Sequence, residues 1–203
     1  MTCASPVSTL DQWTRPLGVL RLSLTARCNL ACPYCCPDSA DPPGTLTLDQ
    51  QLRLIRVVAR LGVRTLRLTG GEPLLSDRLM PLLVGVADGR RTPGDPLGGL
   101  RDVALTTNGV LLSEGRARAL KNTGLDRITV SLDAVDGAVA ATMAGLRGGR
   151  SAGDGLVQQV LAGLAAARAA GFDPAAGDLK LNAVIQRGAV SYTHLTLPTS
   201  FLV

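Results

Sequence analysis

The sequence predicts an α/β fold in which parallel strands alternate with helices, as a sheet or a barrel, and three observations lead to this fold class. Five short runs of alternating apolar and polar residues are separated by segments whose apolar residues recur at helical spacing. Thr, Gly, Asn, Ser and Asp residues follow the predicted strands, at the ends where such folds bind ligands. The 203 residues, 46% of them hydrophobic and 18% charged, are enough for one domain with its own core.

The first strand is expected over residues 19–25, after an irregular lead-in over residues 1–18. The strand residues alternate between apolar and polar, whereas the lead-in contains prolines and shows no period. Thr47 can cap a helix that continues through Leu61, because the apolar residues between them have helical spacing. The other elements follow the same two patterns, with strands over residues 63–69, 102–106, 127–131 and 179–185, and helices over residues 79–87, 113–123 and 156–170.

Three segments stand apart from this alternation. Residues 89–99 form a turn-rich linker, and the glycine-rich residues 145–155 are interpreted as an incidental insertion, with a loop over the site as the alternative. Residues 191–203 contain no Ala, Arg, Gly or acidic residue but hold His194, the only histidine. We interpret them as a non-native tail after genuine sequence that ends near residue 190, with an ordinary terminal strand as the alternative. His194 is therefore a poor candidate for catalysis.

Composition and charge narrow the classes of partner. The net charge is +5, but all except two of the 21 basic residues are arginines scattered along the chain, and aromatic residues make up only 2%. A surface that stacks nucleic-acid bases is not expected, whereas a small anionic ligand fits this charge. No run approaches the roughly 18 apolar residues of a membrane-spanning helix, and no export signal precedes the first strand, so we expect no membrane contact and a cytoplasmic protein.

Four of the five cysteines lie within nine residues directly after the first strand. Cys28, Cys32 and Cys35 have the spacing Cys-x3-Cys-x2-Cys, and three thiolates held this closely can ligate three irons of a cubane 4Fe-4S cluster. The fourth iron then has no protein ligand and is open to chemistry. A zinc site completed by Cys36 and a merely redox-labile cysteine group remain alternatives, although zinc normally takes four ligands. Clustered cysteines in a chain without an export signal favour metal over disulfides.

At these cysteines the chain resembles the radical S-adenosylmethionine (SAM) superfamily. Residues 21–30 (RLSLTARCNL), 67–74 (RLTGGEPL), 106–109 (TTNG) and 130–133 (VSLD), together with the Cys-Pro pair at 36–37, are similar to the GTP 3′,8-cyclase family of molybdenum cofactor biosynthesis. The resemblance runs from about residue 19 to residue 188. This chain departs from the family at Ala26, where the family usually has Asp, and at Cys36, where it usually has Met.

The resemblance implies a partial (β/α) TIM-like barrel of the radical SAM type, incomplete at the C-terminus, with residues 19–190 as the core domain. It implies conversion of GTP to (8S)-3′,8-cyclo-7,8-dihydroguanosine 5′-triphosphate, driven by an external reductant and by a 5′-deoxyadenosyl radical from SAM that abstracts the ribose H3′. Family members continue into a C-terminal portion whose second 4Fe-4S cluster helps to hold GTP, and the full-length form is a possible homodimer. The fragment alone is expected to be inactive in this conversion of GTP.

The resemblance also implies roles for single residues. Cys28, Cys32 and Cys35 would ligate the cluster. Tyr34 would contact the adenine of SAM, the backbone at Gly71 its ammonium group, and Ser131 its carboxylate. Four further residues would hold GTP: Arg21, Arg67, Thr106 and Lys180.

Less specific interpretations remain beside these roles. The Gly-Gly-Glu-Pro sequence could be a simple turn, and the arginines and the lysine could be surface charges. Two other functions also stay open: another radical SAM enzyme such as a peptide-modifying maturase, or a non-catalytic iron–sulfur fragment.

Overall fold

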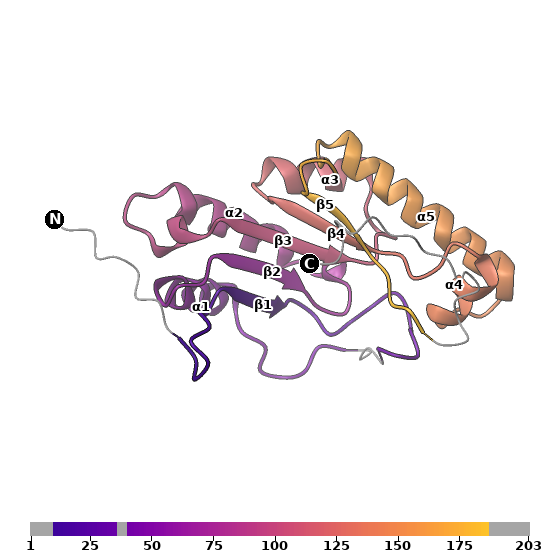
Figure 1. Cartoon of the computed structure of the whole chain (residues 1–203), viewed down its shortest axis with the longest axis horizontal. Helices are drawn as coiled ribbons and strands as arrows, with labels where there is room; N and C mark the ends of the chain where they lie inside the picture. The colour runs from indigo at the N-terminus through magenta and orange to yellow at the C-terminus, as the bar shows by residue number, and fades with distance from the viewer. Residues whose placement is uncertain (1–9, 36–39, 187–203) are drawn as a thin grey trace.

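The computed structural model of the chain describes residues 10–35 and 40–186, which fold into one parallel sheet with helices against it (Figure 1). The order of the strands in the sheet is their order in the chain. The five strands are β1 (Val19–Ser23), β2 (Thr65–Thr69), β3 (Asp102–Thr107), β4 (Arg127–Ser131) and β5 (Leu179–Asn182). Within the described residues β1 and β5 do not pair, so the sheet is an open, partial barrel and the predicted α/β fold class is confirmed.

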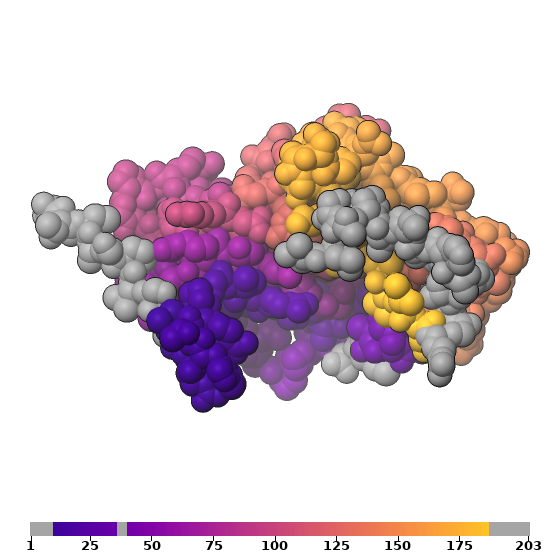
Figure 2. All heavy atoms as spheres, viewed as in Figure 1, coloured from indigo at the N-terminus to yellow at the C-terminus, as the bar shows by residue number. Residues whose placement is uncertain are grey.

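The helices bury one face of this sheet. They are α1 (Leu48–Arg60), α2 (Leu79–Arg91), α3 (Glu114–Asn122), α4 (Gly137–Met143) and α5 (Gly149–Ala169), with short 3-10 turns η1 (Pro73–Leu75) and η2 (Pro96–Gly99). The core joins alternate strand residues such as Leu66 and Leu105 to helix residues such as Ile55 and Val160. Helices α1 and α2 lie at one end of the molecule, and helices α4 and α5 lie at the other end (Figures 1 and 2). None of the described helices has the length and apolarity needed to cross a membrane.

The other face of the sheet carries polar residues. Residues in matching register of neighbouring parallel strands point to the same side, so the strand pairing shows which residues share this face. Arg21 on β1 pairs with Arg67 on β2. Further along the sheet, Thr129 on β4 lies between Thr106 on β3 and Lys180 on β5. The four residues that the resemblance assigns to GTP therefore share one face, opposite the apolar core.

Helix α1 begins as predicted. Thr47 accepts a hydrogen bond from the backbone of Gln50, whose side chain accepts one from the Thr47 backbone, and this reciprocal pair is a capping box. Helix α2 runs on to Arg91, beyond the expected end at residue 87, so the predicted linker over residues 89–99 is partly helical. Strand β5 ends at Asn182, three residues before the expected end.

The prediction for residues 145–155 is wrong from Gly149 onward, because α5 begins there rather than at residue 156. Glycine normally weakens a helix interior, but here it permits close helix packing. A Cβ atom on Gly153 would lie 1.7 Å from the carbonyl oxygen of Gly137 in α4, a helix that the sequence analysis did not predict. Helices α4 and α5 are therefore in direct backbone contact.

The predicted ends of the chain are only partly described. Within the lead-in, residues 10–18 contain an isolated bridge between Leu10 and Pro16. Cys36, the expected boundary near residue 190, and residues 191–203 with His194 lie outside the described residues.

Candidate functional site

Residues 28–35, which we call the cysteine loop, leave the carboxyl end of β1. Cys28 and Cys32 are half-buried and Cys35 is exposed, and all three are free thiols. Within the loop, the amide of Cys35 donates to the carbonyl of Cys32 at 2.9 Å, and the amide of Leu30 donates to Cys28 Sγ at 3.5 Å. The three cysteines thus lie on one short, partly exposed turn at the end of the sheet.

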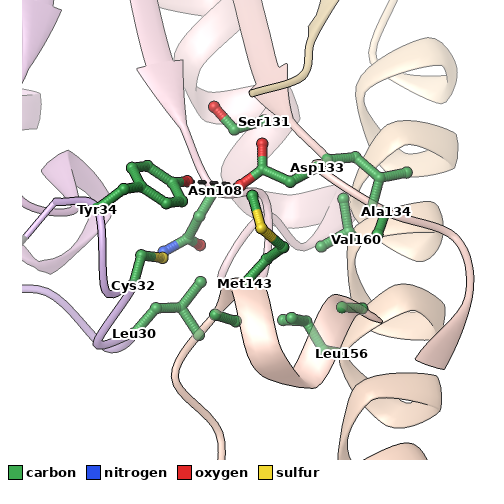
Figure 3. A pocket seen from close by; sticks show the side chains of 13 residues that line it. Leu30, Cys32, Tyr34, Asn108, Ser131, Asp133, Ala134, Met143, Leu156 and Val160 are labelled. Carbon is green, nitrogen blue, oxygen red and sulfur yellow. Dashed lines mark hydrogen bonds between the residues drawn. The ribbon is translucent and has the colours of Figure 1, made fainter. Parts of the chain in front are cut away.

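One hydrogen bond beside each cysteine joins this loop to a different element. Next to Cys28, Asn29 Oδ1 accepts from Asn108 Nδ2 after β3 at 2.8 Å. Next to Cys32, the backbone amide of Ala31 donates to a carbonyl at the end of α4 at 3.1 Å. Next to Cys35, the hydroxyl of Tyr34 donates to Asp133 Oδ2 after β4 at 2.5 Å, as Figure 3 shows. These contacts fix the loop across the carboxyl end of the sheet.

The turn after β2 packs against the entry to the cysteine loop. A Cβ atom on Gly71 would lie 2.3 Å from the carbonyl oxygen of Arg27, so only glycine fits at this position. The backbone amide of Gly71 donates to the carbonyl oxygen of Thr25 at 2.7 Å, and the backbone amide of Glu72 donates to the carbonyl oxygen of Arg27 at 2.8 Å. Within the described residues, the need for glycine here therefore comes from the backbone of Ala26 and Arg27, just before the cysteine loop.

Glu72 is a buried carboxylate that the sequence analysis gave no role. It accepts hydrogen bonds from Thr107 Oγ1 at 2.7 Å, from the amide of Asn108 at 2.8 Å and from the amide of Leu74 at 2.9 Å. Burial raises the pKa of Glu72, and these hydrogen bonds oppose that rise only in part. Glu72 joins the end of β2 to the end of β3, so it holds Asn108 in place beside the cysteine loop. The sequence signal that could have indicated this buried carboxylate is a glutamate between Gly-Gly and an apolar Pro-Leu-Leu.

A pocket opens between the cysteine loop, the end of β4 and helix α4 (Figure 3). Cys32, Tyr34 and Ser131 line it together, so the structure brings these three predicted residues to one cavity. Asp133 adds a carboxylate, and Met143 and Val160 form part of its apolar wall. Gly71 is not among the residues that line this pocket, so its predicted contact with SAM has no geometric support here.

Two pKa values in this pocket are raised. For the Cys32 thiol the main cause is burial, to which the nearby Asp133 carboxylate and the other two cysteines add. For the Tyr34 hydroxyl the main cause is again burial, followed by its hydrogen bond to Asp133. Both groups therefore favour their protonated forms in the free chain.

The predicted GTP residues lie away from this pocket, on the polar face of the sheet. Arg21 and Lys180 are exposed, whereas Arg67 and Thr106 are half-buried. Across the described ranges, the side chains of Arg21, Arg67 and Lys180 form no ion pair or hydrogen bond, although ten ion pairs engage other cations of the chain. Sequence reasoning missed Thr129 in the same row, whose buried hydroxyl has no described partner.

The donor set of the cysteine loop fits an iron–sulfur cluster better than a single ion. Within residues 10–35 and 40–186, no three His, Cys, Asp or Glu side chains converge closely enough to hold one metal ion. A cubane cluster is larger than one ion and takes one thiolate at each iron, so its ligands are spread further apart. Three free thiols on one short turn match that requirement, whereas a structural zinc site needs four tetrahedral ligands.

The fold and this loop agree with a comparison of the sequence with protein families. The profile of the Radical SAM superfamily matches residues 22–189, and the chain belongs to this superfamily. Membership implies a 4Fe-4S cluster and SAM as cofactors.

The comparison with curated proteins gives a more specific result than the superfamily profile, because the matching relatives carry the name GTP 3′,8-cyclase. The protein of Synechococcus sp. strain WH7803 is 68% identical over 190 residues, which cover 94% of this chain and 55% of the relative. That of Parasynechococcus marenigrum strain WH8102 is 71% identical over 185 residues, covering 91% of this chain and 53% of the relative. The chain thus spans about half the length of the curated relatives it matches.

Solved structures confirm the fold. Streptococcus suis SuiB bound to its precursor peptide SuiA has a TM-score of 0.63 at 18% identity, over 85% of this chain and 34% of that chain. HydG, a maturase of the FeFe-hydrogenase, has a TM-score of 0.63 at 16% identity, over 86% of this chain and 36% of that chain. At these identities the likeness is one of fold alone.

Proposed function

We propose that this chain is the radical SAM portion of a GTP 3′,8-cyclase, which converts GTP to (8S)-3′,8-cyclo-7,8-dihydroguanosine 5′-triphosphate in molybdenum cofactor biosynthesis. The observation that carries the proposal is the identity of 66–71% with four proteins of that name over most of the chain. The alternative, a peptide-modifying maturase, is supported only by likeness of fold at 18% identity.

In this proposal Cys28, Cys32 and Cys35 ligate a 4Fe-4S cluster. When bound, the cluster and SAM together supply a one-electron cleavage that generates the radical for hydrogen abstraction. The chain's own part is to hold the three thiols through the contacts of the cysteine loop with Asn108 and Asp133. An external reductant must supply the electron.

The pocket is the proposed SAM site. Ser131 at the end of β4 shares it with Cys32, so its hydroxyl can donate to a carboxylate that reaches the cluster. Tyr34 borders the same space and is assigned to the adenine. The backbone of Gly71 is assigned to the ammonium group of SAM, and only the resemblance supports this assignment.

The polar face of the sheet is the proposed GTP site. Two of its guanidinium groups, those of Arg21 and Arg67, stand side by side in register, and Lys180 lies in one row with Thr106. A half-buried cation without a carboxylate partner is stabilised when an anion binds to it, and arginine can grip phosphate with two donors. The absence of a described partner for Arg67 supports its assignment to the triphosphate.

We further propose that the full-length protein completes the GTP site with a second 4Fe-4S cluster outside the span described here. The core domain then covers residues 19–190, and residues 191–203 are not native to it. The 203-residue chain alone is expected to cleave SAM without forming the cyclised product.

The test has two arms. Anaerobically reconstituted and chemically reduced chain is incubated with SAM, and 5′-deoxyadenosine is measured; its formation is expected, and its absence contradicts radical SAM chemistry in this chain. The full-length protein that contains this span is then given GTP and SAM, and the cyclised nucleotide is measured by mass spectrometry. Cleavage of SAM without any consumption of GTP by the full-length protein overturns the cyclase assignment and favours the maturase.

A further inference from the structure

The cysteine loop has one contact that uses no side chain. The backbone amide of Ala31, next to Cys32, donates to the carbonyl of Ala144 at 3.1 Å. Ala144 is the residue that caps the C-terminal end of α4. The position of Ala31 is therefore set by the backbone of an element more than a hundred residues further along the chain.

Gly145 makes this contact possible. Its φ is +65°, in the left-handed region, and a Cβ atom there would lie 2.0 Å from the carbonyl oxygen of Ala31 and 2.7 Å from its carbonyl carbon. Both atoms belong to the backbone, so they cannot rotate away as the end of a side chain can. Any other residue at position 145 must push Ala31 away from α4.

Helices α4 and α5, which lie behind Gly145, are themselves held in place. Gly153 of α5 lies against the backbone of Gly137 in α4, and Arg150 forms an ion pair with Asp136 at 2.8 Å at the start of α4. Helix α5 is anchored in the core through residues such as Val160. A displacement caused at position 145 is therefore taken up by the exposed cysteine loop rather than by the two packed helices.

We propose that Gly145 is a positioning residue of the cluster site, which sets the place of Cys32 through the backbone of Ala31. The inference rests on the proposed function, because it requires the three cysteines to hold the cluster. Cys32 is the cluster cysteine that lines the pocket with Ser131, so a shift of Ala31 changes the distance between the cluster and the proposed SAM site. Reactive groups tolerate only small displacements of this kind.

The experiment compares Gly145→Ala with Gly149→Ala in the full 203-residue chain. Gly149 is a matched control, because its φ is +60° and nothing lies within 4 Å of the Cβ atom it would gain. Both variants bear the backbone strain of the left-handed region, but only Gly145→Ala meets Ala31. After anaerobic reconstitution, we measure the rate of iron loss to a chelator and the electron paramagnetic resonance spectrum of the reduced cluster with and without SAM.

Gly149→Ala is expected to match the unsubstituted chain in both readouts. Gly145→Ala is expected to lose iron about tenfold faster, the scale seen when a residue that orients a metal ligand is changed. The spectral change caused by SAM should be lost as well. A second pair, Gly145→Asn and Gly149→Asn, repeats the comparison with a residue that tolerates the left-handed region, in case Gly145→Ala does not fold.

Two results overturn the inference, and they can be told apart. If both Gly145 variants match their Gly149 counterparts in iron loss and in the response to SAM, Gly145 does not position the cluster while the proposed function stands. If the unsubstituted chain itself binds no cluster, the proposed function and the role of Gly145 fail together.

Discussion

The carboxyl end of the sheet and its polar face carry the two sets of candidate residues, and the two regions are built differently. At the carboxyl end, Asn29 and Tyr34 of the cysteine loop each have a hydrogen-bond partner on another element. On the polar face, the side chains of Arg67 and Lys180 have no such partner among the described residues. The first region is organised by the chain itself, whereas the second has unpaired cations whose natural partner is an anion. Asn29 and Tyr34 therefore maintain the fold, whereas Arg67 and Lys180 are the residues proposed to bind GTP.

The largest expected effect is the loss of the cluster from the first region, the carboxyl end of the sheet. Replacement of Cys28, Cys32 or Cys35 by Ala should abolish the cluster, whereas Cys3→Ala and Cys36→Ala should leave about one four-iron cluster per chain. Iron analysis and the visible spectrum after anaerobic reconstitution measure this. If iron survives Cys32→Ala but is lost with Cys36→Ala, the ligand assignment is wrong.

The next prediction concerns the second region and uses the full-length protein. Arg67→Ala or Lys180→Ala should weaken GTP binding by about tenfold or more, as expected when roughly 1.5–3 kcal/mol of charged hydrogen bonding is lost. Iron content and SAM cleavage should largely survive.

The control for this prediction is Arg53→Ala, because Arg53 is an exposed arginine on α1 already paired with Asp49 at 2.8 Å. It should leave GTP affinity unchanged, as measured by equilibrium dialysis. Equal affinities for Arg67→Ala, Lys180→Ala and the control would remove the phosphate-binding role.

Glu72 offers a prediction about the stability of the first region. Glu72→Ala leaves the Thr107 hydroxyl and the amide of Asn108 without their acceptor, at a cost of about 1–3 kcal/mol for each buried group. Denaturant unfolding of the apo chain should show this loss. A fall of less than about 0.5 kcal/mol, the usual range for surface changes, would mean that the carboxylate does not organise the turn.

The same side chain predicts a dependence on pH. Because the folded state raises the pKa of Glu72 above its ordinary 4.5, folding favours the protonated acid. The contribution of Glu72 to stability is therefore fully present below about pH 4.5 and is lost as the pH rises through the folded-state pKa. Relative to Glu72→Gln, which does not titrate, the unfolding free energy of the unsubstituted chain should fall across that window. A difference that stays constant or rises with pH would contradict the raised pKa.

The smallest predicted effect has the opposite sign. Thr129 has a buried hydroxyl with no described hydrogen-bond partner, so Thr129→Val removes a polar group without removing a bond. The variant should be more stable by about 1 kcal/mol, within the range for burying an unpaired hydroxyl. Thermal unfolding of the apo chain measures it. A clear loss of stability would show that the hydroxyl has a partner.

The sequence predicted the elements of this fold well because their signals are local. Alternation along five short runs located the strands, and Thr47 marked the start of α1. Helix α4 was missed although Asp136 accepts hydrogen bonds from the amides of Ala138 and Val139, a capping signal that is visible in the sequence. The start of α5 was misplaced because Gly149, Gly153 and Gly155 resemble a loop in the sequence, and only the packing of Gly153 against α4 gives one of them a structural reason.

The candidate site divides in the same way. The cysteine spacing is local and could be recognised, whereas the contact of Tyr34 with Asp133 joins residues about a hundred positions apart. The bonds of Glu72 to β3 and the backbone contact between Ala31 and Ala144 likewise depend on how the strands are ordered in the sheet. Such pairs follow from tertiary structure, so composition and spacing cannot reveal them.

The order of the strands also has a consequence for how the protein is made. Because β1 to β5 lie side by side in the order of synthesis, each strand leaving the ribosome finds its partner already present as the edge of the sheet. Strand pairing need not wait for a later segment to be inserted between two earlier ones, and each pairing closes only one helix-containing crossover. The nascent chain can therefore extend its sheet one strand at a time, from the cysteine loop's own strand outward.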